Sequence, residues 1–210
     1  MIHAYDKNYL YKSQNNLGIM FDFVVYDLQE NLSDFFEKFL DSKISKQFER
    51  GESSVIVGKS GIELSLEILN NSKLASKYRP VANKSPEYWC GWALAYFQWY
   101  TNLSFIQINK YIPINEILSF YSPYHEMDIT HFCDKMIELY NERKNYSNLK
   151  NYRLLASLSQ KELASITEIP IRTIQQYEQK QKNINVAKTE TVLKLAKALN
   201  TSVENLIEIA

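Results

Sequence analysis

A short segment near the C-terminus carries side chains that can bind the edges of DNA base pairs. Its members are Ile171, Arg172, Thr173, Gln175 and Gln176. Arg172 can donate two hydrogen bonds to the O6 and N7 atoms of guanine, and Gln176 can pair with the N6 and N7 atoms of adenine. Ile171 and the Thr173 methyl group can pack on a thymine methyl group. Together they would distinguish bases, provided that one exposed helix presents them to a major groove.

The residues before this segment predict a helix that would support it. The Ser159 side chain can accept a hydrogen bond from the backbone N–H of Glu162, and Glu162 can reach back to the Ser159 N–H, which completes a capping box. We expect Leu163, Ala164 and Ile166 to face inward from this helix. Ala164 is small enough to let a crossing helix approach closely.

A second helix is predicted after a turn at residues 167–169. Pro170 would start it, because proline has its φ already set and has no N–H to leave unpaired. Ile174 and Tyr177 can hold this helix against the domain. The five base-binding side chains would then lie on its outer, N-terminal side, as a recognition helix requires.

Residues 148–209 resemble the Cro/repressor-type helix-turn-helix domain of the XRE family, a five-helix DNA-binding module. Arg153 stands where the family has an arginine in its first helix, and Glu178 where its recognition helix ends in a glutamate. The resemblance implies an ion pair between these two residues. It also implies base contacts at residues 171, 172 and 176, and a phosphate contact at Gln160.

The same segment supplies further candidate phosphate contacts and two more helices. Beside Gln160, the candidates for phosphate binding are Lys161, Lys180 and Lys182. A fourth amphipathic helix is predicted from the spacing of Val192, Leu195, Ala196 and Leu199. A second capping box is predicted at Thr201 and Glu204, before the closing apolar residues Val203, Leu206 and Ile207.

Two residues depart from the family's pattern. Glu168 stands in the turn where the family favours glycine, and Lys180 stands where glycine often follows the recognition helix. If the backbone at such a position is left-handed, a residue other than glycine costs about 1 kcal/mol there. Neither change removes a side chain that would face DNA.

Charge and length favour two domains and an all-α fold. The chain has 210 residues with 24 basic and 24 acidic side chains. Residues 146–210, the predicted DNA-binding domain, have nine basic and six acidic side chains, a net charge of +3, which leaves −3 for residues 1–145. A surplus of three is small for a protein whose affinity depends on releasing counterions from phosphates. We therefore expect a homodimer to bind double-stranded DNA.

Residues 1–145 are predicted to form a helical domain that binds a partner or dimerises. A long first helix would place Leu10, Leu17, Phe21, Val24 and Leu28 on one face, interrupted by Gly18. Further helices are predicted to start at Ser33, at Ser60-Gly61 and at Ser85-Pro86-Glu87, and to break at Pro113. A loop is predicted around Arg79-Pro80 and Lys84-Ser85, a last helix over 127–143, and a linker or continued helix over 141–151.

Aromatic residues are concentrated between residues 88 and 124, and all three tryptophans, Trp89, Trp92 and Trp99, lie within eleven residues. At 100° per residue the aromatic side chains of residues 88–100 cover almost the whole helix surface. A helix that is apolar all round is usually buried. The alternative is a groove for a partner, since Trp and Tyr are also preferred anchors at interfaces.

Other patterns give little support to catalysis. Gly58-Lys59-Ser60 resembles the end of a phosphate-binding loop, but Ser53 stands where that loop needs a glycine. His125, His131 and Cys133 do not share a helix face, so they form no tetrahedral metal site. We expect no enzyme, no metal and no cofactor. Two cysteines fit a reducing cytoplasm, and the absence of a signal peptide or an apolar span predicts a soluble protein away from the membrane.

The whole layout, including the segment from Glu87 to Tyr96, resembles helix-turn-helix proteins of Gram-positive gut bacteria. Those proteins are often antitoxin-like partners of ADP-ribosyltransferase-like toxins. The resemblance implies that residues 1–145 bind a toxin while residues 146–210 repress the shared operon. Two alternatives stay open. One is a repressor that answers to a small ligand or only dimerises, and the other is a protein-binding scaffold with a vestigial DNA-binding module.

Overall fold

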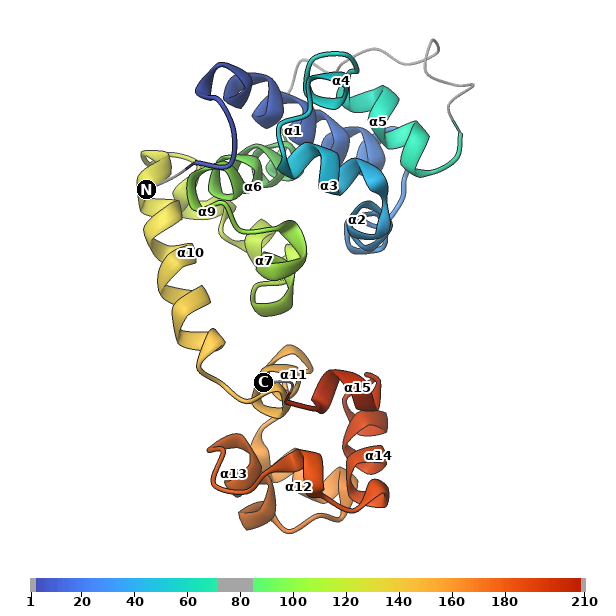
Figure 1. Cartoon of the computed structure of the whole chain (residues 1–210), viewed down its shortest axis with the longest axis vertical. Coiled ribbons are helices and arrows are strands. Elements are labelled where there is room, and N and C mark those ends of the chain that lie inside the picture. The colour runs from blue at the N-terminus through green and yellow to red at the C-terminus, as the bar shows by residue number, and fades with distance from the viewer. Residues whose placement is uncertain (1–2, 72–84, 209–210) are drawn as a thin grey trace. The chain divides into compact units, whose positions relative to one another are not determined.

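The computed structural model describes residues 3–71 and 85–208, and the described residues are helical with no strand. Contacts divide the chain into two compact units, residues 1–140 and 141–210 (Figure 1). Each unit has a hydrophobic core of its own. The expected all-α fold is confirmed. Among the described residues, no helix combines the length and the apolar character that a membrane crossing requires.

The N-terminal unit is built from ten α-helices and a short 3-10 helix within the described residues. They are η1 (Lys7–Tyr9), α1 (Leu10–Tyr26), α2 (Leu32–Asp41), α3 (Lys43–Glu49), α4 (Ser53–Ile56), α5 (Gly61–Ile68), α6 (Pro86–Thr101), α7 (Phe105–Tyr111), α8 (Ile114–Ser119), α9 (Tyr121–Tyr124) and α10 (Ile129–Lys144). The long helices α1 and α6 pack against each other, and shorter helices surround them (Figure 1).

Two glycines allow α1 and α6 to approach closely. A Cβ atom built on Gly91 would lie 2.4 Å from the backbone oxygen of Leu17, and one built on Gly18 would lie 2.9 Å from the backbone oxygen of Tyr88. The expectation that Gly18 interrupts the first helix is therefore wrong. Helix α1 runs through it unbroken, and the missing side chain makes room for the neighbouring backbone.

Phenylalanine rings fill the space beside α1. Phe21 of α1 meets Phe36 of α2 edge to face, with ring centroids 5.7 Å apart. Phe39 of α2 meets Phe48 of α3 at 6.4 Å and Phe105 of α7 at 5.2 Å. These five rings are almost completely buried. Aromatic pairs in such geometries add stability beyond the area that they bury, so they fix the short helices to the central pair.

Helix starts follow the capping side chains, with one correction. Ser60 begins α5 with a capping box to Glu63, and Ser85 begins α6 with proline at its first position, both as predicted. The prediction of a cap at Ser33 is wrong, because the Asn31 side chain accepts from the N–H groups of Ser33 and Asp34. The predicted loop around Arg79-Pro80 lies outside the described residues.

The end of the N-terminal unit also differs from expectation in detail. Helix α10 begins at Ile129 and ends at Lys144, rather than spanning 127–143. The next helix, α11 (Asn148–Leu155), begins four residues later, after its cap at Ser147. The segment expected as a linker or a continued helix over 141–151 is thus two helix ends and a short turn.

Helix α6 is largely the buried central helix that its composition predicts. Tyr88, Phe97 and Trp99 are buried, whereas Trp89 and Trp92 are only partly buried. Cys90 lies inside the core, where burial raises the pKa of its thiol. The partly buried tryptophans leave one side of α6 accessible, and this side lines a cavity.

Candidate nucleic-acid interface

The C-terminal unit contains five helices and one 3-10 turn among its described residues. After α11 they are α12 (Gln160–Thr167), α13 (Ile171–Glu178), η3 (Ile184–Val186), α14 (Thr189–Ala198) and α15 (Val203–Leu206). Helices α12 and α13 are the predicted helix-turn-helix pair. Their buried apolar residues pack on α14, where Val192, Leu195, Ala196 and Leu199 face the core as predicted.

The capping box that begins α12 is present. The Glu162 N–H donates to the Ser159 hydroxyl at 3.1 Å, and the Ser159 N–H donates to the Glu162 carboxylate at 2.7 Å. Leu163 is fully buried, but Ile166 is 58% exposed, so the expectation that Ile166 faces inward is wrong. Thr167, the next residue, is buried instead of Ile166. Its hydroxyl donates to the Leu163 carbonyl at 2.6 Å, which satisfies a polar group that would otherwise be costly to bury.

Both departures from the family's glycine pattern fall on left-handed backbone. Glu168, which ends α12, has φ 57°, and Lys180, after α13, has φ 56°. The chain therefore makes its two tight turns without the residue that adopts this conformation most easily. Ile169, within the first turn, is buried and anchors it to the core.

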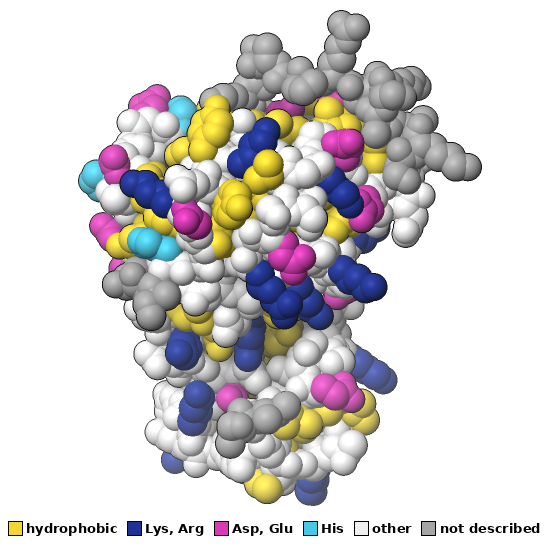
Figure 2. Space-filling model, turned by 45° about the horizontal axis from the view of Figure 1, so that its top comes forward, with side chains coloured by type: hydrophobic (Ala, Val, Ile, Leu, Met, Phe, Trp, Pro, Cys, Tyr) yellow, Lys and Arg dark blue, Asp and Glu magenta, His cyan; other side chains and the backbone are white. Residues whose placement is uncertain are grey.

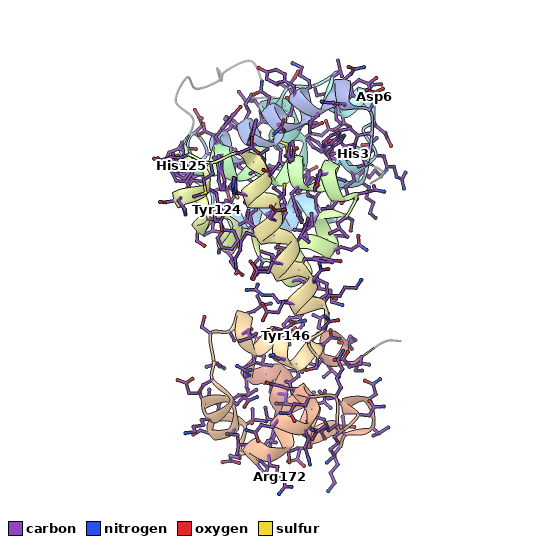
Figure 3. All side chains as sticks on the ribbon, turned by 90° about the vertical axis from the view of Figure 1, so that its left-hand side faces the viewer. His3, Asp6, Tyr124, His125, Tyr146 and Arg172 are labelled. Atoms are coloured by element: carbon purple, nitrogen blue, oxygen red, sulfur yellow. The ribbon has the colours of Figure 1, made fainter. Side chains whose placement is uncertain are left out.

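Helix α13 presents one polar side and buries the other. Pro170 is the N-cap and not, as expected, the first helical residue. Ile174 and Tyr177 are buried, as predicted, together with Glu178. Arg172 is exposed and points away from the unit (Figure 3). The other four candidate base-contacting residues, Ile171, Thr173, Gln175 and Gln176, are half-buried.

A buried ion pair joins α11 to α13. The Arg153 guanidinium donates from Nε to one Glu178 oxygen at 2.6 Å and from Nη2 to the other at 2.9 Å. Its Nη1 donates to the Leu158 carbonyl at 2.7 Å. Such a two-pronged arrangement satisfies both partners inside the protein, which is the condition for a buried pair to be tolerated.

Gln160 extends this network to the polar side of α13. Its amide donates to Glu178 at 2.7 Å, and its carbonyl accepts from the Gln175 amide at a longer 3.4 Å. The candidate phosphate contact and a candidate base contact thus lie side by side. Sequence alone did not bring Gln160 and Gln175 together, because no local pattern encodes a contact across the turn.

A hollow with both basic and acidic side chains in its lining lies next to α13. The hollow, about 440 Å³, lies between α13 and the start of α14, and Thr173 faces it. Lys182, Lys188 and Lys194 line it together with Glu168 and Glu190, and the Lys194 ammonium lies 3.4 Å from the Glu190 carboxylate. The candidate phosphate contacts Lys161, Lys180 and Lys182 are all exposed, and Lys182 lies 5.4 Å from the Tyr177 ring. Lys188, at the N-cap position of α14, also lines the hollow and is not among the predicted phosphate contacts. Figure 2 shows Lys and Arg side chains spread over this unit, in the lower part of the view.

The closing segment of the unit differs from prediction. Helix α15 has Ser202 at its N-cap position, without a capping hydrogen bond from the Ser202 side chain, so the capping box expected from Thr201 and Glu204 is wrong. Beyond α15, the Glu208 carboxylate accepts from the N–H of Asn148 at 2.6 Å. The Asn185 side chain donates to the Glu208 carbonyl and accepts from its N–H. These contacts tie the end of the described chain to the start of α11.

The comparison with protein families decides what this unit is. A family model described as helix-turn-helix matches residues 149–206. This segment is an XRE-type helix-turn-helix. The protein is accordingly a DNA-binding transcription regulator, with the match confined to its C-terminal unit. No curated protein and no solved structure matches the chain.

Proposed function

We propose that the XRE-type domain reads a specific operator by placing α13 in the major groove. The observation that carries the proposal is Arg172, which stands exposed at the first turn of a helix held down by Ile174 and Tyr177. Arg172 would pair with guanine and Gln176 with adenine. Ile171 and Thr173 would contact thymine methyl groups.

Phosphate contacts would fix the domain on the duplex. Gln160 uses one amide N–H on Glu178, which leaves its second N–H for a phosphate oxygen at the start of α12. Lys161, Lys180 and Lys182 add charge on either side, and Lys188 joins them across the hollow. We propose that two copies bind together, because one domain with a net charge of +3 releases few counterions. Their half-sites would lie about 34 Å apart.

DNA selection tests this proposal. We would recover sites from a random duplex pool with the full chain, then titrate the recovered site and a scrambled duplex at one salt concentration. Arg172→Ala should weaken binding to the recovered site by about 1–3 kcal/mol and relax the sequence preference at one base pair. The matched control is Arg50→Ala, an exposed arginine of the N-terminal unit. Equal affinity of wild type and Arg172→Ala for the recovered site would refute the assignment.

For the whole chain we propose an autorepressor without catalytic activity, acting in the cytoplasm where it meets its operator. The resemblance of the layout supports an antitoxin role, in which the N-terminal unit binds a toxin of the ADP-ribosyltransferase-like class. Co-expression with the product of the neighbouring gene, followed by affinity capture, tests toxin binding. A shift assay on the gene's own promoter tests autorepression. If the protein retains neither the product of the neighbouring gene nor the promoter DNA, the antitoxin hypothesis is refuted.

One observation favours the alternative of a ligand-responsive repressor. The accessible side of α6 lines a cavity of small-molecule size within the N-terminal unit. A scaffold with a vestigial DNA-binding module would bind neither operator nor ligand. The DNA titration separates this scaffold from the two repressor hypotheses, and the capture experiment separates an antitoxin from a repressor that has no toxin partner.

A further inference from the structure

The N-terminal unit contains a cavity with aromatic walls. Its volume is about 300 Å³, and its lining consists of Tyr88, Trp89, Trp92, Tyr121, Tyr124, His125, Met127 and Ile129. These residues come from α6, from α9 and its following turn, and from the start of α10. Figure 3 labels Tyr124 and His125, which the α9 segment places at the edge of this unit. The volume matches the lower end of small-molecule sites.

Ring contacts hold the walls of the cavity in place. Trp89 and Tyr121 meet at 80° with centroids 5.7 Å apart, so the cavity has walls in two directions. Phe132, which is fully buried, supports Trp89 at 5.3 Å and Tyr124 at 6.4 Å from behind. His125 stacks on Tyr121 at 4.0 Å. A site formed in advance loses little free energy to ordering when a ligand binds.

The residues in and next to the cavity favour a ligand with a positive charge. None of its lining residues, all of them described, is a lysine or arginine. Glu126 and Asp128 flank Met127 on the turn between α9 and α10, and both are exposed. The Thr130 hydroxyl and N–H both donate to the Asp128 carboxylate, and these hydrogen bonds lower the pKa of Asp128. An anion would meet aromatic faces and two carboxylates next to the lining residues in the chain, and both would repel it.

We propose that this cavity binds a small organic cation of the alkylammonium class. Trp89, Trp92 and Tyr124 would contact the ammonium group, because the faces of electron-rich rings attract a positive charge once water is excluded. Glu126 and Asp128, which adjoin the lining residue Met127 in the chain, would add a longer-range attraction, although the Glu126 carboxylate also lies 3.5 Å from His125 Nε2. The site is independent of the DNA-binding face, so its failure would leave the operator proposal standing, and the reverse also holds.

Calorimetric titration of the full chain with choline tests the charge preference. The comparison ligand is its neutral isostere, the alcohol in which carbon replaces the ammonium nitrogen. We expect saturable choline binding and at least about tenfold weaker binding of the alcohol. Equal affinity of the two ligands, or no choline binding at concentrations up to about 10 mM, would overturn the proposal.

Variants locate the site. Trp92→Leu and Tyr124→Leu should each weaken choline binding about tenfold or more, whereas Tyr124→Phe should retain it because the ring face remains. The matched control is Tyr100→Leu on the same helix, outside the cavity lining. Circular dichroism establishes that each variant is folded, and if a leucine variant fails this check the other decides. Unchanged binding in the folded leucine variants, or equal weakening by Tyr100→Leu, would contradict the location.

Discussion

Gln160 at the start of α12 donates its side-chain N–H to Glu178 at the end of α13, at 2.7 Å. The same carboxylate accepts both prongs of the Arg153 guanidinium. One buried acidic group therefore connects three helices, and Gln175 joins it through Gln160. The side of α13 proposed to face DNA is positioned from beneath by this network.

Removal of that carboxylate should destabilise the C-terminal unit. Glu178→Ala leaves the Arg153 charge buried without its partner, which typically costs about 3–5 kcal/mol. The free energy of unfolding would be measured by denaturant titration with circular dichroism. Glu190→Ala is the matched control, because its ion pair with Lys194 is exposed and such pairs contribute about 0–1 kcal/mol. Similar losses in the two variants would show that the buried network contributes no more than a surface pair.

Glycine at the two left-handed positions should stabilise the domain. Glu168→Gly and Lys180→Gly each remove a strained side chain at φ near 57°, and we expect a gain of about 1 kcal/mol apiece. Lys197→Gly is the control, since this exposed residue has helical backbone in the last turn of α14 and the variant should lose up to about 1 kcal/mol. Thermal unfolding followed by circular dichroism distinguishes a gain in stability from a loss. A loss at both turn positions would mean that the side chains make contacts outweighing the strain.

Salt dependence should separate phosphate contacts from base contacts. Lys182→Ala should weaken binding to operator and scrambled duplex alike and reduce the slope of log K against log salt by about 1. Fluorescence anisotropy on labelled duplexes at several salt concentrations measures both. Lys38→Ala, an exposed lysine of the N-terminal unit, serves as control and should leave the slope unchanged. An unaltered slope for Lys182→Ala would remove this residue from the interface.

The two cysteines should be unreactive in the folded protein. Burial raises the pKa of both thiols, that of Cys133 to about 12, so at pH 8 each stays protonated and the nucleophilic thiolate is scarce. A coloured disulfide reagent should react slowly with the native protein. After denaturation it should react quickly with both thiols. Fast labelling of the native chain would show that one of the two sites opens to solvent.

Local signals in the sequence were sufficient for much of the fold. The caps at Ser60, Ser85 and Ser159 lie next to the N–H groups that they bind, so a few residues determine the helix start. The same logic failed where two capping residues compete. Asn31 precedes Ser33 and takes the cap, since its side chain reaches two N–H groups at once.

Tertiary relationships were harder to foresee. The burial of Thr167 instead of Ile166 depends on a hydrogen bond to the Leu163 carbonyl, which no hydrophobic pattern predicts. The contact between Gln160 and Gln175 spans a turn, and the cavity beside α6 is formed by segments distant in sequence. Composition predicted that the aromatic segment was either a buried helix or a groove for a partner. In the structure α6 has one buried side and one accessible side, so it combines features of both.

The backbone contact between Gly18 and Gly91 restricts how this protein can diverge. A methyl group at Gly91 would overlap the Leu17 oxygen, and that oxygen belongs to a helix that cannot retreat without moving the phenylalanine rings behind it. Gly18 is restricted in the same way, because a methyl group there would meet the Tyr88 backbone oxygen. Distant homologues of the N-terminal unit should be recognisable by a pair of small residues at matching places in their two long helices, even where the remaining sequence has lost all likeness.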